Sequence, residues 1–161
     1  MLKYRLLTSE ELRELEEEFK HFLIINQIYD DEWKLLNQQK SQKVEELIVL
    51  FSNLVIEKAL KKIAFLEIIT NNGINAFYCK ENEMELIGIS TENKQFDFTL
   101  VKESSDIRNQ SLSIFKTSKP YFKTREIEVF NLINSGCSII SSERYKKLEL
   151  AYNLSIKQFK N

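Results

Sequence analysis

The period of the hydrophobic pattern changes twice along this chain, and these changes restrict the folds open to it. Apolar residues recur every three or four positions up to about residue 61 and again after residue 103, as in helices with one buried face. Between these segments, short β-branched and aromatic runs alternate with turn-forming residues, which is typical of strands. A chain of 161 residues, 43% hydrophobic, is long enough to bury a core. The pattern predicts a single α+β domain over residues 1–161.

Three helices are expected before the strands. Thr8 and Glu11 have the spacing of a capping box, so the first helix should begin after Thr8. Asp30 is expected to cap a short second helix, and a third should cover Ser41 to about Lys61. The apolar face of this third helix is unusually wide. It is expected to be covered on two sides, by other helices and by either the sheet or a second subunit.

The middle of the chain predicts a four-stranded antiparallel meander. Turn-forming pairs such as Asn72 and Gly73 separate the strand-like runs. The expected strands are Ile63–Thr70, Ile74–Lys80, Met84–Thr91 and Gln95–Val101. The first of these runs is also compatible with an extension of the preceding helix, and that alternative stays open.

Helical periods return in the C-terminal third of the chain. A helix is expected over Ile107–Ser118, ended by Pro120. Thr124 should cap the next helix, which ends before Gly136 in the left-handed conformation. After a short apolar link, Ser141 or Ser142 should cap a last helix that runs to about Phe159. These helices are expected to pack on the sheet.

Motifs for catalysis and for cofactor binding are largely missing from the sequence. His21 is the single histidine, and Cys79 and Cys137 lie in unrelated segments, so no metal-ligand spacing is present. The three glycines are isolated, which argues against a phosphate-binding loop. We therefore expect no metal, no cofactor and reduced, structural thiols. A catalytic pair assembled only by the fold is compatible with the sequence, so a small enzyme with a pocket between sheet and helices remains an alternative.

The charges are unevenly distributed. Residues 1–105 contain 13 Lys and Arg against 19 Asp and Glu, whereas residues 106–161 contain 10 against 5. The basic C-terminal part is most concentrated between residues 116 and 125, where aromatic residues stand among the cations. The predicted anion-binding residues are Lys116, Lys119, Lys123, Arg125, Lys146 and Lys147. The alternative is that Tyr121 and Phe122 fill the core while the lysines are solvated or face the acidic first helix.

These features favour a non-enzymatic binding or adaptor protein, whose basic C-terminal surface contacts an anionic partner, either a protein or a nucleic acid. Self-association is a further alternative, because the wide face of the third helix offers a dimer seam, and a homodimer is one expected partner arrangement. The first residues lack a signal-peptide pattern, and no apolar run approaches the length of a membrane span. We therefore expect a cytoplasmic protein that does not bind membranes.

Four segments resemble a small bacterial family of uncharacterised cytosolic proteins, a domain of unknown function. They are residues 2–28, residues 30–36 with the sequence DDEWKLL, residues 44–67, and residues 119–149, which begin KPYFKTREIEVF. The resemblance spans nearly the whole chain. It implies a cytosolic bacterial protein and assigns no site residues.

Overall fold

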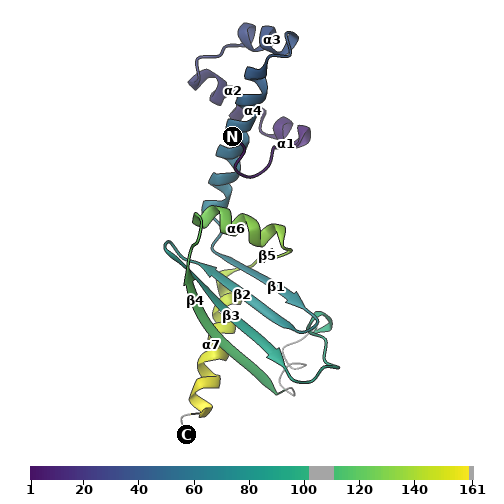
Figure 1. The fold of residues 1–161 in the computed structure, drawn as a ribbon, viewed down its shortest axis with the longest axis vertical. Coiled ribbons are helices and arrows are strands. Elements are labelled where there is room, and N and C mark those ends of the chain that lie inside the picture. Colours follow the sequence, from purple (N-terminus) through teal and green to yellow (C-terminus); the bar gives the residue numbers. More distant parts are fainter. Residues whose placement is uncertain (102–110, 160–161) are drawn as a thin grey trace. The chain divides into compact units, whose positions relative to one another are not determined.

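The chain has an α+β fold with N-terminal helices, an antiparallel sheet and C-terminal helices packed against the sheet (Figure 1). The computed structural model describes residues 1–101 and 111–159. The described contacts divide the chain into two compact units: unit 1, Met1–Leu60, and unit 2, Lys61–Asn161. The predicted fold class is confirmed.

Unit 1 is helical. Its helices are α1 (Ser9–Glu14), α2 (Glu16–Ile25), α3 (Asp30–Gln38) and α4 (Gln42–Lys61), the last extending one residue into unit 2. The predicted capping box is confirmed, since the Glu11 amide donates to Thr8 Oγ1 at 3.1 Å and the Thr8 amide donates to Glu11 Oε2 at 2.8 Å. Two expectations are corrected. The first helix is interrupted at Leu15, and Asp30 is the first residue of α3, with Tyr29 at the cap position.

Aromatic rings fill the core of unit 1. Phe51 of α4 is 2% exposed, and its ring centroid lies 4.8 Å from that of Phe19 and 5.3 Å from that of Phe22. Trp33 of α3 meets Phe19 edge to face at 5.3 Å. These contacts hold α2, α3 and α4 together. They stabilise the packing because burial of aromatic rings removes large apolar areas from water.

Unit 2 is built on a five-stranded antiparallel sheet. The strands are β1 (Phe65–Thr70), β2 (Gly73–Cys79), β3 (Glu83–Thr91), β4 (Leu112–Pro120) and β5 (Ser138–Ile139), in the order β4-β3-β2-β1-β5. The first three predicted strands are confirmed, and β1 is a strand rather than an extension of α4. The short link after Gly136 contributes β5, which pairs with β1.

The fourth strand lies elsewhere than predicted. Gln95–Val101 contains the 3-10 turn η1 (Phe98–Leu100), whose Phe98 is buried in the core of unit 2. The strand β4 instead occupies Leu112–Pro120, so the helix predicted over Ile107–Ser118 is wrong for residues 112–118, while residues 107–110 lie outside the described residues. The alternating pattern of β4 is hard to recognise in the sequence. Its largely apolar face carries the charged Lys116, and its largely polar face carries the apolar Phe115.

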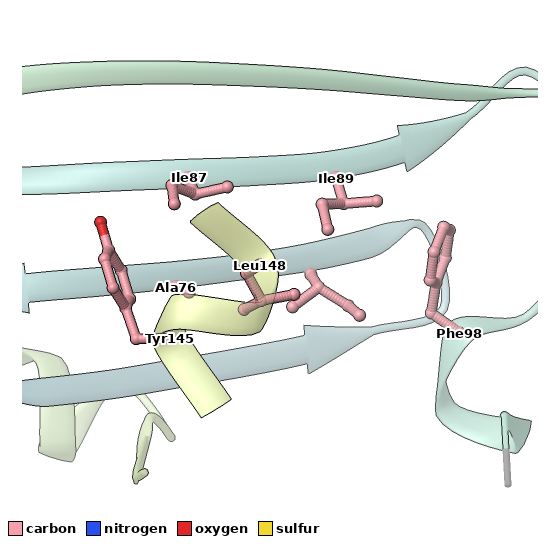
Figure 2. Packing of buried hydrophobic residues seen from close by; sticks show 7 residues of the cluster. Ala76, Ile87, Ile89, Phe98, Tyr145 and Leu148 are labelled. Atoms are coloured by element: carbon pink, nitrogen blue, oxygen red, sulfur yellow. The ribbon is translucent and has the colours of Figure 1, made fainter. Parts of the chain in front are cut away.

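Two C-terminal helices complete unit 2. Helix α6 (Arg125–Asn134) is capped by the Thr124 side chain, and Gly136 follows it at φ 101°, as predicted. Helix α7 (Ser142–Phe159) begins after Ser141, whose Oγ accepts a hydrogen bond from the Arg144 amide at 3.1 Å. Its side chains Tyr145 and Leu148 pack onto one sheet face, against residues of β2 and β3 that include Ala76, Ile87 and Ile89 (Figure 2).

Candidate anion-binding pocket

The strand geometry of β4 separates two of the predicted anion-binding residues. Lys116 is paired with Ile87, which faces α7, whereas Lys119 is paired with Met84. Successive side chains of a strand point to opposite faces, so residues three apart lie on different faces of the sheet.

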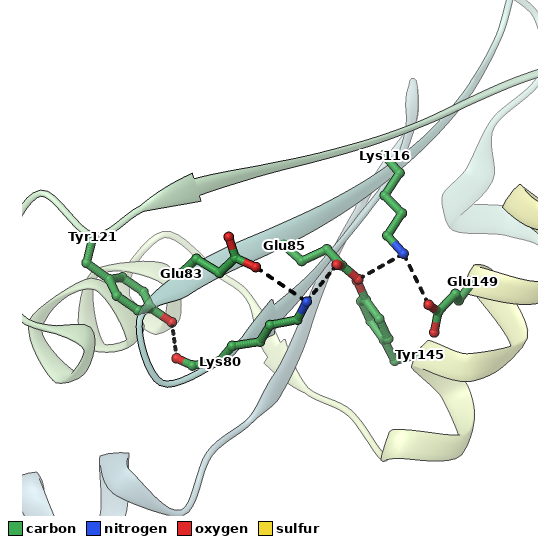
Figure 3. Close-up of polar contacts among 7 residues, drawn as sticks. All are labelled: Lys80, Glu83, Glu85, Lys116, Tyr121, Tyr145 and Glu149. Carbon is green, nitrogen blue, oxygen red and sulfur yellow. Dashed lines mark hydrogen bonds and ion pairs between the residues drawn. The ribbon is translucent and has the colours of Figure 1, made fainter.

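On the α7 face, Lys116 is part of a partly buried network of charged groups (Figure 3). Its Nζ lies 3.3 Å from Glu85 Oε1 and 3.1 Å from Glu149 Oε1. Glu85, 8% exposed, also accepts hydrogen bonds from Lys80 Nζ at 3.0 Å and from the Tyr145 hydroxyl at 2.8 Å. Lys116 is therefore neutralised within the fold, and this network joins β3, β4, α7 and the turn that follows β2.

The buried titratable groups of unit 2 predict that its stability depends on pH. Burial opposes ionisation of Glu85, but hydrogen bonds from Lys80, Tyr145 and Lys116 outweigh it, so the pKa of Glu85 lies below its ordinary 4.5. Burial raises the pKa of the Cys79 thiol to about 11 and the pKa of Tyr145 above its ordinary 10. The folded unit thus binds fewer protons than the unfolded chain in acid and more in alkali. Stability should fall as the pH drops below about 4.5 and as it rises above about 9.

Urea unfolding at several pH values, followed by amide NMR signals of unit 2, measures this dependence. In the variant Glu85→Gln, the loss of stability in acid should be smaller, because the variant carries no carboxylate at this position. An unchanged acid limb in this variant would show that other carboxylates produce the acid dependence.

On the opposite face of the sheet, a pocket of about 330 Å³ lies beside α6. Its apolar lining comes from Phe77 of β2, Met84 of β3 and Leu132 of α6. Lys119 and Lys123 contribute the cationic groups, and the ring of Phe122 is 93% exposed. The remaining lining residues are Glu128, Asn131 and Ser135. An apolar floor beside cationic groups suits a ligand that carries both an apolar group and an anion.

Glu128 organises the loop between β4 and α6. Its Oε1 accepts hydrogen bonds from the Phe122 amide at 2.6 Å and the Lys123 amide at 3.3 Å, while its Oε2 lies 3.2 Å from Lys119 Nζ. Burial disfavours the charged carboxylate, but these hydrogen bonds outweigh burial and lower the pKa of Glu128. The carboxylate stays ionised at neutral pH and holds the loop that carries Phe122 and Lys123 against α6.

The remaining predicted site residues lie apart from this pocket lining. The Arg125 guanidinium donates to the main-chain oxygens of Cys79 and Ile63 and is largely buried, so it ties α6 to the sheet. Lys146 and Lys147 are exposed on α7, whose packed face covers the other side of the sheet. The structure thus brings Lys119 and Lys123 together and leaves the other four predicted residues outside the pocket lining.

The two aromatic residues of the basic segment behave differently from each other. Tyr121 is half-buried, and its hydroxyl donates to the Lys80 main-chain oxygen at 2.7 Å. Burial raises its pKa to about 12. The alternative prediction that these two aromatic residues fill the core therefore holds for Tyr121 only, while Phe122 projects into solvent at the pocket.

Comparison with protein families finds a match that covers most of the chain. A model of a family of unknown function, DUF6495, matches residues 1–153. The chain belongs to DUF6495. The matched residues include the pocket lining of this DUF6495 protein. No curated protein and no solved structure matches the chain.

The sequence contained only part of the information needed to find this pocket. The lysines were indicated by their density, but Phe77, Met84 and Leu132 look like ordinary core residues in their own segments. No local signal connects them with Lys119, since only the sheet and α6 bring them together.

Within residues 1–101 and 111–159, the structure contains no cluster of three or more residues suited to metal binding. No helix in this described part is long and apolar enough to span a bilayer.

Proposed function

We propose that this DUF6495 protein is a non-enzymatic binding or adaptor protein, whose anionic partner is an acidic segment of another protein. The observation that carries the proposal is the pocket beside α6, where Lys119 and Lys123 stand at an apolar floor next to the exposed ring of Phe122. A partner segment would place an apolar side chain in the pocket and a carboxylate against the two lysines. We further propose that this activity belongs to a bacterial cytosol, as the resemblance described above implies.

A protein segment fits this pocket better than a nucleic acid does. Binding to nucleic acid draws most of its affinity from several phosphate contacts made at once. Here Lys116 is neutralised by Glu85 and Glu149, and Arg125 is bound to main-chain oxygens. Two pocket lysines, of which Lys119 also contacts Glu128 at 3.2 Å, and an apolar floor instead match a short segment in which an acid lies near an apolar side chain.

The enzyme alternative receives less support from the titratable groups. Tyr145 and Glu85 have shifted pKa values, but both are buried and hydrogen-bonded to each other within the network that joins α7 to the sheet. A structural ion-pair network shifts pKa values as an active site does. The binding proposal uses the pocket on the other face.

A binding experiment with synthetic polymers tests the proposal. Fluorescence anisotropy should show that the protein binds a glutamate–tyrosine copolymer more tightly than polyglutamate or a deoxythymidine oligonucleotide. The double variant Lys119→Ala and Lys123→Ala should weaken copolymer binding roughly tenfold, if each lysine contributes about 0.7 kcal/mol. Raising the salt concentration should weaken binding by the wild-type protein and affect this variant less.

The matched control is the double variant Lys146→Ala and Lys147→Ala, which removes the same charge from α7. It should bind the copolymer within about twofold of wild type, because these lysines lie outside the pocket lining. An equal loss in both double variants would show that net charge drives binding. Tighter binding of the oligonucleotide would assign the site to nucleic acid. Either result rejects the proposal.

Self-association is a second candidate, favoured by the exposed apolar residues of unit 1. Ile25, Tyr29, Leu50 and Leu54 are all exposed, although each is large and apolar. Such residues mark an interaction surface when they are contiguous. A homodimer would double the mass measured by light scattering, and a mass equal to that of one chain over a wide concentration range would reject this candidate.

A further inference from the structure

β4 is an edge strand of the sheet and lies beside the pocket. The strand covers Leu112–Pro120 and pairs with β3, and it is the first strand in the order of the sheet (Figure 1). Among the described residues, no strand pairs with its other side. In an antiparallel strand, every second residue directs its amide and carbonyl groups away from the neighbour. This edge therefore presents main-chain donors and acceptors to an extended segment.

The side chains of β4 on the pocket face give this edge a chemical pattern. They are Ser113, Phe115, Thr117 and Lys119, since Lys119 lines the pocket and the others follow at two-residue spacing. Phe115 is 48% exposed, and its ring lies over Gly88 of β3: a Cβ at Gly88 would be 2.2 Å from Phe115 Cε1. The ring therefore leans towards β3 and away from the outer edge of β4.

We propose that the acidic partner segment binds as an additional strand along the outer edge of β4, antiparallel to it. A carboxylate of the segment lies opposite Lys119, and an apolar side chain four residues later lies opposite Phe115, in addition to the one at the pocket. Directly opposed side chains on one sheet face are within contact distance, and this spacing follows from the two-residue period of strands. The inference rests on the proposed function and specifies how the partner is recognised: main-chain hydrogen bonds supply affinity, and alternate side chains supply selectivity.

The charge of β4 argues for an acidic segment rather than a second copy of this strand. Residues 112–120 include Lys116 and Lys119 and no acidic residue. Pairing two copies of β4 would add a second exposed Lys119 to the ribbon and no carboxylate, since Lys116 is already neutralised by Glu85 and Glu149. An acidic segment neutralises Lys119, whose side chain is 63% exposed even with Glu128 beside it.

An array of synthetic nine-residue peptides tests this inference. In a serine, threonine and valine background, one peptide has glutamate at the third position and phenylalanine at the seventh. Two others have the reverse order or a separation of three residues. The first should bind at least about fivefold more tightly than the other two, because a three-residue separation puts the two side chains on opposite faces. In the variant Phe115→Ala this preference should fall to less than about twofold, and Lys146→Ala should leave it unchanged.

Two further measurements test whether the peptide pairs with the main chain of β4. N-methylation of the best-binding peptide at successive positions should abolish binding at every second position only, because alternate amides face β4. Amide exchange measured by NMR should slow at alternate residues of β4 when the peptide binds. Binding without any spacing preference, or N-methylation effects without a period of two, would overturn the strand-addition inference. The copolymer result would then still decide the proposed function separately.

Discussion

Replacement of Tyr145 by alanine is expected to lower the free energy of unfolding of unit 2 by about 3–5 kcal/mol, the usual cost of truncating a buried aromatic residue. Tyr145 is 1% exposed, and its ring centroid lies 5.2 Å from that of Phe65 and 5.7 Å from that of Tyr78. Its hydroxyl also donates to Glu85. Removing the side chain therefore leaves a cavity under α7 and removes one of the hydrogen bonds to a buried carboxylate.

Two further variants separate these contributions. Tyr145→Phe keeps the ring and removes only the hydroxyl, so it should cost about 1–2 kcal/mol. Tyr152→Ala truncates a half-buried tyrosine on the same helix and should cost less than Tyr145→Ala. Urea unfolding followed by NMR signals of unit 2 measures all three. If the two alanine variants were equally stable, the aromatic cluster at Tyr145 would not be the main attachment of α7.

Replacement of Phe51 by alanine is expected to destabilise unit 1 by a similar amount, about 3–5 kcal/mol. The ring is 2% exposed and packs between Phe19 and Phe22 of α2. No side chain nearby is free to fill the space, because these rings already pack against one another and against Trp33. The variant should therefore loosen the packing of α2 and α3 on α4.

The neighbouring residue provides a matched control. Leu50 belongs to the same helix but is 51% exposed, so Leu50→Ala should change the free energy of unfolding by no more than about 0.5 kcal/mol. Trp33 is the single tryptophan of the chain and contacts Phe19, so its fluorescence reports on unit 1. A large effect of Leu50→Ala, comparable to that of Phe51→Ala, would indicate that the exposed face of α4 is covered in solution.

Much of the fold could be predicted from local chemistry. The capping box at Thr8 and Glu11, the cap at Thr124 and the left-handed Gly136 were all correct, because each depends on side chains within a few residues of the helix end. The turns at Gly73 and around Glu81 located the ends of β1, β2 and β3 for the same reason. Hydrogen bonds between near neighbours leave a signal in a short stretch of sequence.

The strand at residues 112–120 could not be predicted from local chemistry. Lys116 faces the sheet's covered side because Glu85 and Glu149, distant in sequence, compensate its charge there. Phe115 lies on the exposed side because Gly88 of the neighbouring strand leaves space for its ring. Both residues reverse the usual hydrophobic pattern, and both do so through partners that only the folded chain provides. The predicted basic cluster consequently divides between the two faces of β4.

By itself, the sequence determined the fold class, most helix and strand boundaries, and the concentration of cations in the C-terminal third, since these follow from local periodicity, capping and composition. The tertiary structure alone decided that residues 112–120 form a strand, that Lys116 and Arg125 are bound within the fold, and that Lys119 and Lys123 meet Phe77, Met84 and Leu132 at one pocket. The physical reason is that burial, charge compensation and pocket shape depend on which distant segments pack together.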